Sequence, residues 1–330
     1  PDGEKFYQYQ VEANTTTKMK ADELHQLGLK EVMRIGAEMD RILDDAGYKQ
    51  TTRAARLNAL SKAPSQVYPD SDAGRAQVLK DYQAHIDEII AGLGPMFFSP
   101  PKAKVVVERV PAISEKTSAF AYYNPPTFDG SRPGTFYANL RKVDEIAKFG
   151  MRTLAYHEAV PGHHLQVATA IELKGLPIFR KLVPFTAYGE GWALYAEQLA
   201  WEYGFQKDPL DNLGRLQAEM FRAVRLVVDT GIHAKKWTRE QAIDYMIANT
   251  GMAEIEVIAE IERYFVMPGQ ALAYKVGMIK ILQLREKAKA ALGAKFDIRE
   301  FHDAVLKNGG MPLDILERVV DAYVAGKKAE

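Results

Sequence analysis

Apolar residues recur at spacings of three and four along most of the chain, and this pattern constrains the fold more than any other feature of the sequence. Between residues 19 and 43 the pattern comprises Leu24, Leu27, Val32, Ile35, Met39 and Ile42. Such a spacing gathers apolar side chains on one face of an α-helix. The same pattern covers residues 73–93, 140–160, 185–201, 210–234, 253–265, 271–292 and 313–325. The chain is therefore predicted to be mainly α-helical.

Two helices have explicit start signals in the sequence. Asp208 followed by Pro209 offers an N-cap and then a proline at the first helical position, where its missing N–H costs nothing. Residues 238–241 read Thr-Arg-Glu-Gln, which is the pattern of a capping box. Helices are expected to begin at both places.

The segment from residue 95 to residue 134 breaks the helical pattern, because Pro and Gly cluster there. Residues 105–110 contain four valines over the length of a strand, and residues 119–123 could pair with them. We expect a small β-sheet or hairpin around residues 105–123, followed by a loop at Asn124, Pro125 and Pro126. No internal repeat, low-complexity tract or Gly/Ser linker divides the chain, so a single domain over residues 1–330 is predicted.

Charge and cysteine content narrow the function classes. Lys plus Arg and Asp plus Glu both total 43, which leaves no basic field for nucleic acid. The chain has no Cys, so His and carboxylates are the strong protein ligands left for a metal. No apolar run of about 18 residues predicts a membrane span. The first residues show no targeting signal, and the absence of an initial Met suggests a processed or truncated chain. A periplasmic and a cytoplasmic location both stay open.

The segment His-Glu-Ala-Val-Pro-Gly-His-His at residues 157–164 carries three of the seven histidines. In an H-E-x-x-H helix, two histidines one turn apart bind zinc and the glutamate activates the metal-bound water. Here Pro161 interrupts the pattern, since proline disturbs a helix. If a two-residue bulge accommodates Pro161 and Gly162, His157 and His163 regain the one-turn relationship. In an unbroken helix His164 would lie about 10 Å along the axis from His157, too far to share a metal. His163 is therefore the preferred second ligand, with His164 as the alternative.

A third ligand is expected from the segment 188–197, which contains Glu190 and Glu197 two helical turns apart. One of them can bind the metal while the other orients a metal-bound histidine. We predict Glu190 as the ligand and Glu197 as the orienting residue. Two His and one Glu would leave a position for water, as in catalytic zinc sites.

At this point the sequence resembles the DUF885 family, a bacterial group related to the zincin-like peptidases. The resemblance rests on H-E-A-V-P-G-H-H-L-Q at 157–166, G-E-G-W-A-L-Y-A-E at 189–197, D-T-G-I-H at 229–233 and P-G-Q-A-L-A-Y-K-V-G at 268–277. It implies a mainly helical fold similar to that of the thimet oligopeptidase and angiotensin-converting-enzyme groups, with short peptides as substrates. Since family members are longer, this chain resembles their C-terminal, motif-bearing part.

The resulting hypothesis is a zinc peptidase in which His157, His163 and Glu190 bind Zn²⁺ and Glu158 is the general base. Tyr274 or His233 could stabilise the oxyanion, and the alternative for each is an ordinary packed residue, which is the commoner role of a tyrosine. Arg222 and Arg225 could bind a peptide carboxylate or form ordinary salt bridges.

Two rival interpretations remain. A non-catalytic metal- or peptide-binding protein would follow if His164 completed a closed four-ligand site. A non-haem iron oxygenase also uses two His and a carboxylate. Glu158 beside His157 favours hydrolysis. The sequence does not indicate the oligomeric state.

Overall fold

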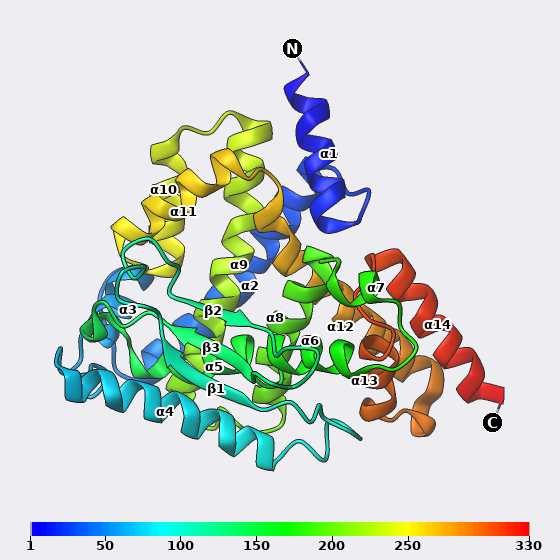
Figure 1. The fold of residues 1–330 in the computed structure, drawn as a ribbon. Helices are drawn as coiled ribbons and strands as arrows, with labels where there is room; N and C mark the ends of the chain where they lie inside the picture. The colour runs from blue at the N-terminus through cyan, green and yellow to red at the C-terminus, as the bar shows by residue number, and fades with distance from the viewer. Residues whose placement is uncertain (1, 330) are drawn as a thin grey trace. The chain divides into compact units, whose positions relative to one another are not determined.

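The computed structural model describes residues 2–329, which are mainly helical with one small β-sheet (Figure 1). The α-helices are α1 (Gly3–Thr15), α2 (Ala21–Asp45), α3 (Arg53–Ser61), α4 (Asp72–Ala91), α5 (Lys148–Glu158), α6 (His163–Glu172), α7 (Ile178–Leu182), α8 (Thr186–Glu202), α9 (Pro209–Lys235), α10 (Arg239–Thr250), α11 (Glu254–Val266), α12 (Ala273–Leu292), α13 (Ile298–Leu306) and α14 (Leu313–Ala329). The strands are β1 (Val105–Arg109), β2 (Ala121–Asn124) and β3 (Gly134–Ala138). Short 3₁₀ helices are η1 (Val143–Glu145), η2 (Gln270–Leu272) and η3 (Gly293–Lys295).

The chain divides into two compact units, each assembled from three stretches of sequence. The first unit comprises the stretch ending at Val67 together with Glu145–Thr153 and Gln206–Val276. The second comprises Tyr68–Asp144, Leu154–Phe205 and the stretch that begins at Gly277. The prediction of one domain is not tested by this division.

The core of the first unit forms where α2 packs against α9. Helix α10 also packs against α9. Gly28 of α2 permits the close approach, because a Cβ there would lie 2.7 Å from Cβ of Leu226. The buried apolar side chains come from the faces that the sequence pattern predicted, for example Ile35 and Met39 of α2 and Val224 of α9. The unit therefore follows from the amphipathic period of its helices.

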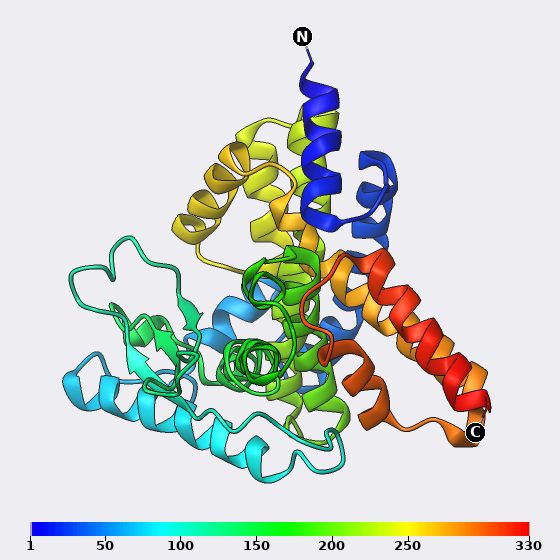
Figure 2. The ribbon, with the colours of Figure 1, turned by 45° about the vertical axis from the view of Figure 1, so that its right-hand side comes forward.

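The second unit contains the sheet, whose strand order is β1-β3-β2. Strand β1 pairs in parallel with β3, and β2 pairs antiparallel with β3. The predicted direct pairing of residues 105–110 with 119–123 is therefore wrong. The strand Gly134–Ala138 lies between them, and all its residues except Tyr137 are buried. Helix α4 runs along the β1 side of the sheet in both ribbon views (Figures 1 and 2).

Most predicted helices are confirmed within two or three residues, including the starts at Asp208 and Thr238, whose side chains accept hydrogen bonds from the first turn. The predicted helix over 140–160 is too long, since the observed helix begins only at Lys148. There the backbone N–H of Lys148 donates to the carbonyl of Gln66, a contact that the local pattern could not reveal. Helices α1, α3, α6, α7 and α13 were not predicted.

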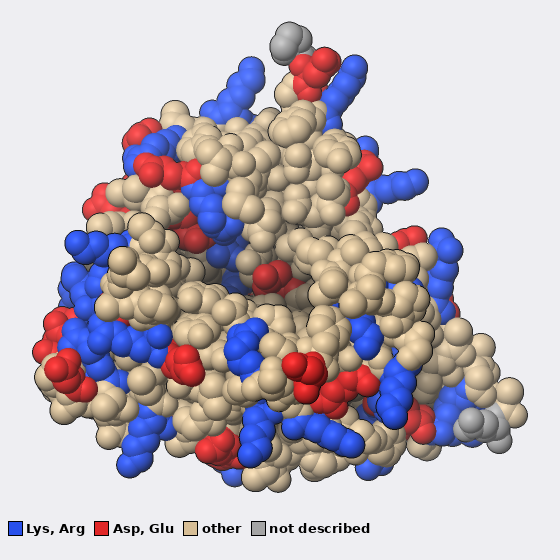
Figure 3. Space-filling view, viewed as in Figure 1, with Lys and Arg blue, Asp and Glu red and all other residues tan. Residues whose placement is uncertain are grey.

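On the face drawn in Figure 3, Lys and Arg side chains are interspersed with Asp and Glu, in keeping with the equal totals of the two charges. None of the helices described combines the length and the hydrophobicity that a membrane crossing requires.

Candidate metal centre

The histidine-rich motif folds as two helices joined by a tight link. Helix α5 ends at Glu158, the link covers residues 159–162 with a cis Val160–Pro161 peptide bond, and α6 begins at His163. Gly162 is required in this link, because a Cβ there would lie 2.0 Å from the carbonyl oxygen of His157. The break differs from the bulge that we expected within one helix. Proline cannot continue the helical ladder, and glycine allows the link to lie close to the last carbonyls of α5.

The link brings His157 and His163 together, and α8 adds Glu190. The Oε2 atom of Glu190 lies 3.6 Å from Nε2 of His157 and 3.4 Å from Nε2 of His163. The two imidazole rings are nearly perpendicular, with centroids 4.8 Å apart. Among residues 2–329 these three side chains form the one group of potential metal ligands whose atoms lie within 4.8 Å of one another. All three belong to the second unit.

The spacing and the charge of this group fit a small divalent cation. Ligand atoms about 2.1 Å from a tetrahedrally coordinated zinc ion lie about 3.4 Å apart, close to the two separations measured from Glu190. The Oε2 atom of Glu190 is buried and has no hydrogen-bond partner among the described residues, which is unusual for a carboxylate. Burial alone would raise the pKa of Glu190, but His163 and His157 outweigh it and hold this pKa well below its ordinary value. The carboxylate is thus ionised and suited to a cation.

Glu197 orients the first histidine of the group. The Nδ1 atom of His157 donates to Oε1 of Glu197 over 2.7 Å, and Glu197 is only 1% exposed. This hydrogen bond makes Nε2 the lone-pair nitrogen of the neutral ring, which is the nitrogen that faces Glu190. Glu190 and Glu197 lie two turns apart on α8, so one helix positions both carboxylates.

His164 points away from this group and fastens α6 to the sheet. Its Nε2 donates to the carbonyl of Ala103 and its Nδ1 accepts from the Tyr123 hydroxyl, each over 2.9 Å. A Cβ on Gly134 would lie 2.4 Å from Nδ1, so glycine is needed there as well. Burial lowers the pKa of His164, which keeps the ring neutral. With both ring nitrogens occupied, His164 is not available as a fourth ligand in this arrangement.

Glu158, the predicted general base, is the last residue of α5 and is buried beside His157. Its charge acts on Tyr82 of α4, since burial and the nearby Glu158 carboxylate together raise the pKa of this tyrosine. Glu158 therefore lies in the interior of the second unit, near α4.

The two predicted oxyanion donors, His233 and Tyr274, belong to the first unit. His233 donates from Nε2 to the carbonyl of Tyr264 over 3.0 Å and stacks on the Tyr7 ring at 4.9 Å. The guanidinium carbon Cζ of Arg225 lies 4.6 Å from the centroid of the Tyr274 ring. Their catalytic roles stay predictions.

The ordinary salt bridge suggested for Arg225 is present, because Arg225 binds Glu260 over 3.0 Å. Arg222 stacks near the Tyr274 ring, with its Cζ 5.9 Å from the centroid.

Tyr123 and Trp192 contact the motif and were not singled out in the sequence. Tyr123 binds His164 from β2, 41 residues away along the chain, and no local pattern signals such a contact. Trp192 donates from its indole nitrogen to the carbonyl of Pro161. Its place in the block 189–197 was a usable signal, because that block also holds Glu190 and Glu197.

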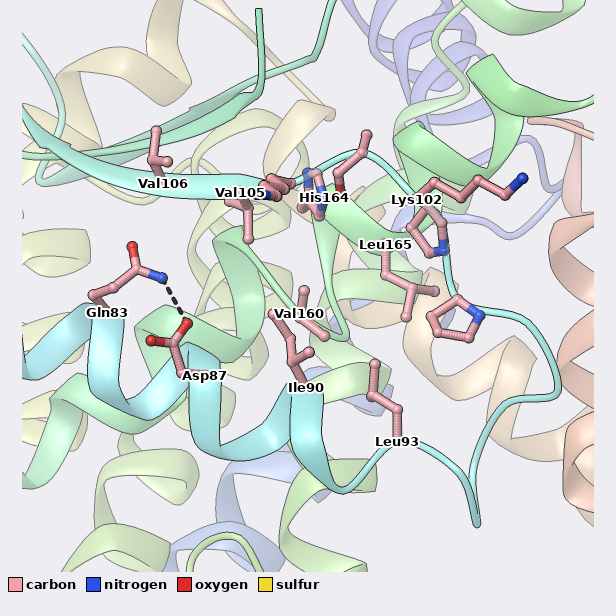
Figure 4. A pocket seen from close by; sticks show the side chains of 14 residues that line it. Gln83, Asp87, Ile90, Leu93, Lys102, Val105, Val106, Val160, His164 and Leu165 are labelled. Atoms are coloured by element: carbon pink, nitrogen blue, oxygen red, sulfur yellow. Dashed lines mark hydrogen bonds between the residues drawn. The ribbon is translucent and has the colours of Figure 1, made fainter. Parts of the chain in front are cut away.

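A separate pocket of about 360 Å³ lies between α4, the segment leading into β1 and the start of α6 (Figure 4). Ile90, Leu93, Val160 and Leu165 give it a largely apolar wall, and Gln83 donates to Asp87 at one side. Gln83 also accepts from the backbone N–H of Val107, so this edge of β1 is partly occupied by α4. His157, His163 and Glu190 do not line this pocket.

Comparisons with known proteins place the chain in a family without assigning a reaction. A family model described as "Bacterial protein of unknown function (DUF885)" matches residues 1–320. No curated protein matches the sequence.

Two solved structures share the fold. One, from Colwellia psychrerythraea, has 48% sequence identity and a TM-score of 0.97, over 99% of this chain and 56% of that chain. Another, from Shewanella oneidensis, has 22% identity and a TM-score of 0.82, over 96% of this chain and 59% of that chain. Both are described by the words "putative lipoprotein", the second as being of unknown function. The chain thus spans less than two thirds of either relative.

Proposed function

The chain belongs to the DUF885 family, and we propose that it is a zinc-dependent peptidase that hydrolyses short peptides. The observation that supports this proposal most is the convergence of His157, His163 and Glu190 around the buried Oε2 atom, which has no hydrogen-bond partner in the described chain. A zincin-like relationship of the fold is part of the proposal. The motif brings two histidines together across the link between α5 and α6, as the zincin-like group does across one helical turn.

The ligand set favours a catalytic over a structural site. His157 and His163 would hold the metal through Nε2, and Glu190 would hold it through a carboxylate oxygen. Three protein ligands are typical of catalytic zinc, whereas structural zinc is closed by four. The closed alternative needed His164, whose two ring nitrogens are bonded to Tyr123 and Ala103. When bound, zinc would lower the pKa of a coordinated water towards 7 and polarise the scissile carbonyl.

Glu158 supplies the proton transfers in this proposal. Its carboxylate accepts the proton of the attacking water and later donates it to the leaving amine, a contribution worth about 10²- to 10⁴-fold in rate. It is buried and directly follows the proposed ligand His157 in the chain. The description of the 48% identical relative favours the periplasmic one of the two locations that the sequence left open.

Metal analysis and metal removal test the proposal directly. Protein purified without chelators should contain about one zinc per chain, should lose peptidase activity on dialysis against a chelator, and should regain it with zinc. His157→Ala should contain no zinc, because it removes a ligand and the partner of Glu197 together. Wild-type protein that neither contains zinc nor takes it up would rule out the proposal. Protein that has no peptidase activity with zinc but consumes O₂ when loaded with Fe²⁺ would point to the oxygenase alternative.

Glu197→Gln is expected to weaken zinc binding by about 10-fold, the lower end of the range for residues that orient a ligand. The amide can still accept from Nδ1 of His157, but it lacks the negative charge that strengthens this bond. Isothermal titration calorimetry of metal-free protein measures the effect. Glu202→Gln is the matched control, since it lies on the same helix and pairs with Arg285. Equal affinities in the two variants would contradict the orienting role.

A further inference from the structure

The indole of Trp192 forms a buried hydrogen bond to the link between the two histidine-bearing helices. Its Nε1–H donates to the carbonyl oxygen of Pro161 over 2.9 Å, and Trp192 has an exposed fraction of 0%. Pro161 is buried as well. This bond joins α8, which carries Glu190, to the segment that places His163 beside His157.

The other hydrogen bonds of the link join its backbone to α5 and α6. Residues 159–162 lie outside both helices, and proline has no N–H to donate. The carbonyls of Ala159 and Gly162 accept from the first turns of α6. The carbonyl of Pro161, between them, is bonded instead to Trp192. Because an unpaired buried carbonyl is costly, this bond selects one orientation of the Pro161 peptide.

The indole is itself held in place by a rigid aromatic cluster. Trp192 packs edge-on against Phe97 at 6.3 Å and His302 at 5.5 Å, and lies 5.4 Å from the Tyr195 ring. His302 donates from Nδ1 to the carbonyl of Met96 and accepts from the Tyr195 hydroxyl, each over 2.8 Å. A donor fixed in this way can restrain the group to which it is bonded.

Glu190 and Trp192 reach the motif from different faces of α8. Two positions along an α-helix correspond to a rotation of about 200°. Glu190 therefore approaches the histidines from one side of the helix, while Trp192 approaches Pro161 from another. Together they define the position of the link relative to α8 more tightly than either contact alone.

We propose that Trp192 is a positioning residue for the metal centre, which acts through the Pro161 carbonyl on the distance between His163 and the other two ligands. This inference rests on the proposed zinc site and extends it to a residue that touches none of the ligands' metal-binding atoms.

Trp192→Phe tests the inference, since it keeps an aromatic ring and removes the N–H donor. Zinc affinity of the metal-free protein, measured by calorimetry, should fall by about 10- to 100-fold, the range known for residues that support ligands. The visible absorption spectrum of the Co²⁺-loaded variant should also change, because it reports ligand geometry.

Trp201→Phe, on the same helix and 40% exposed, is the control and should bind zinc as wild type does. A purely structural role would lower the melting temperature of metal-free Trp192→Phe and leave zinc affinity and the Co²⁺ spectrum unchanged. That result would overturn the inference.

Indole NMR of the unmutated protein covers the case in which Trp192→Phe does not fold. The chain has three tryptophans, so Trp201→Phe and Trp237→Phe assign the Trp192 signal by elimination. Its Nε1–H should exchange slowly with water and should shift when zinc is added. Zinc binding without a shift of this signal would refute the role of Trp192 and leave the proposed zinc site unaffected. Wild-type protein that binds no zinc would refute the proposed function and, with it, this inference.

Discussion

The Glu158→Gln variant is expected to bind zinc as tightly as the wild type and to lose about 10²- to 10⁴-fold in kcat for peptide hydrolysis. The amide has nearly the same shape as the carboxylate, so the end of α5 should keep its structure. It cannot accept the proton of the attacking water, and this loss falls on the chemical step. The ligand atoms of His157, His163 and Glu190 are unchanged by the substitution.

Steady-state kinetics on a short fluorogenic peptide, with zinc content measured on the same samples, gives both quantities. Glu202→Gln serves again as the control for a Glu-to-Gln change in the second unit. A fully active Glu158→Gln enzyme would exclude the general-base assignment. Loss of zinc together with activity would instead assign Glu158 to the support of the metal.

His163→Ala and His164→Gln are adjacent substitutions for which the structure predicts opposite results. His163→Ala should weaken zinc binding by more than about 100-fold, beyond the loss typical of residues that only support a ligand. The reason is that Nε2 of His163 lies 3.4 Å from the Glu190 carboxylate and belongs to the ligand group. Zinc per chain after dialysis and calorimetry measure the loss.

His164→Gln should retain zinc, because both nitrogens of His164 bond to Ala103 and Tyr123. The substitution should lower the free energy of unfolding by about 1–3 kcal/mol, because buried hydrogen bonds are left unmade. Urea unfolding of the metal-free protein measures that difference. Zinc lost from His164→Gln and kept by His163→Ala would reverse the ligand assignment.

Much of the helical fold was predictable because helices are encoded by local spacing. Helices α2, α9 and α14 have long amphipathic patterns, and α9 and α10 also have side-chain caps at Asp208 and Thr238. Short helices such as α3 and α7 were missed. Helices of five to nine residues are marginal on their own and form because tertiary contacts stabilise them.

The sheet shows the limit of this approach. The valine-rich strand β1 was recognisable, but its partner β3 begins 25 residues after β1 ends, and the two run parallel. Pairing of that kind depends on how the connecting chain returns, so a sequence pattern that is read locally favours the nearer antiparallel partner. The same reasoning explains why the contact of Tyr123 with His164 was not expected.

For the candidate metal centre, the sequence by itself determined which chemistry was available. The absence of Cys left His and carboxylates, and the motif supplied His157, Glu158 and His163 within seven residues, with Glu190 and Glu197 two turns apart on one helix. Only the tertiary structure decided that Glu190 lies between the two histidines, that Glu197 orients His157, and that His164 turns to the sheet. The physical reason is that a residue type and its helical phase are local properties, whereas the partner of each imidazole nitrogen is set by packing between segments that are distant in sequence.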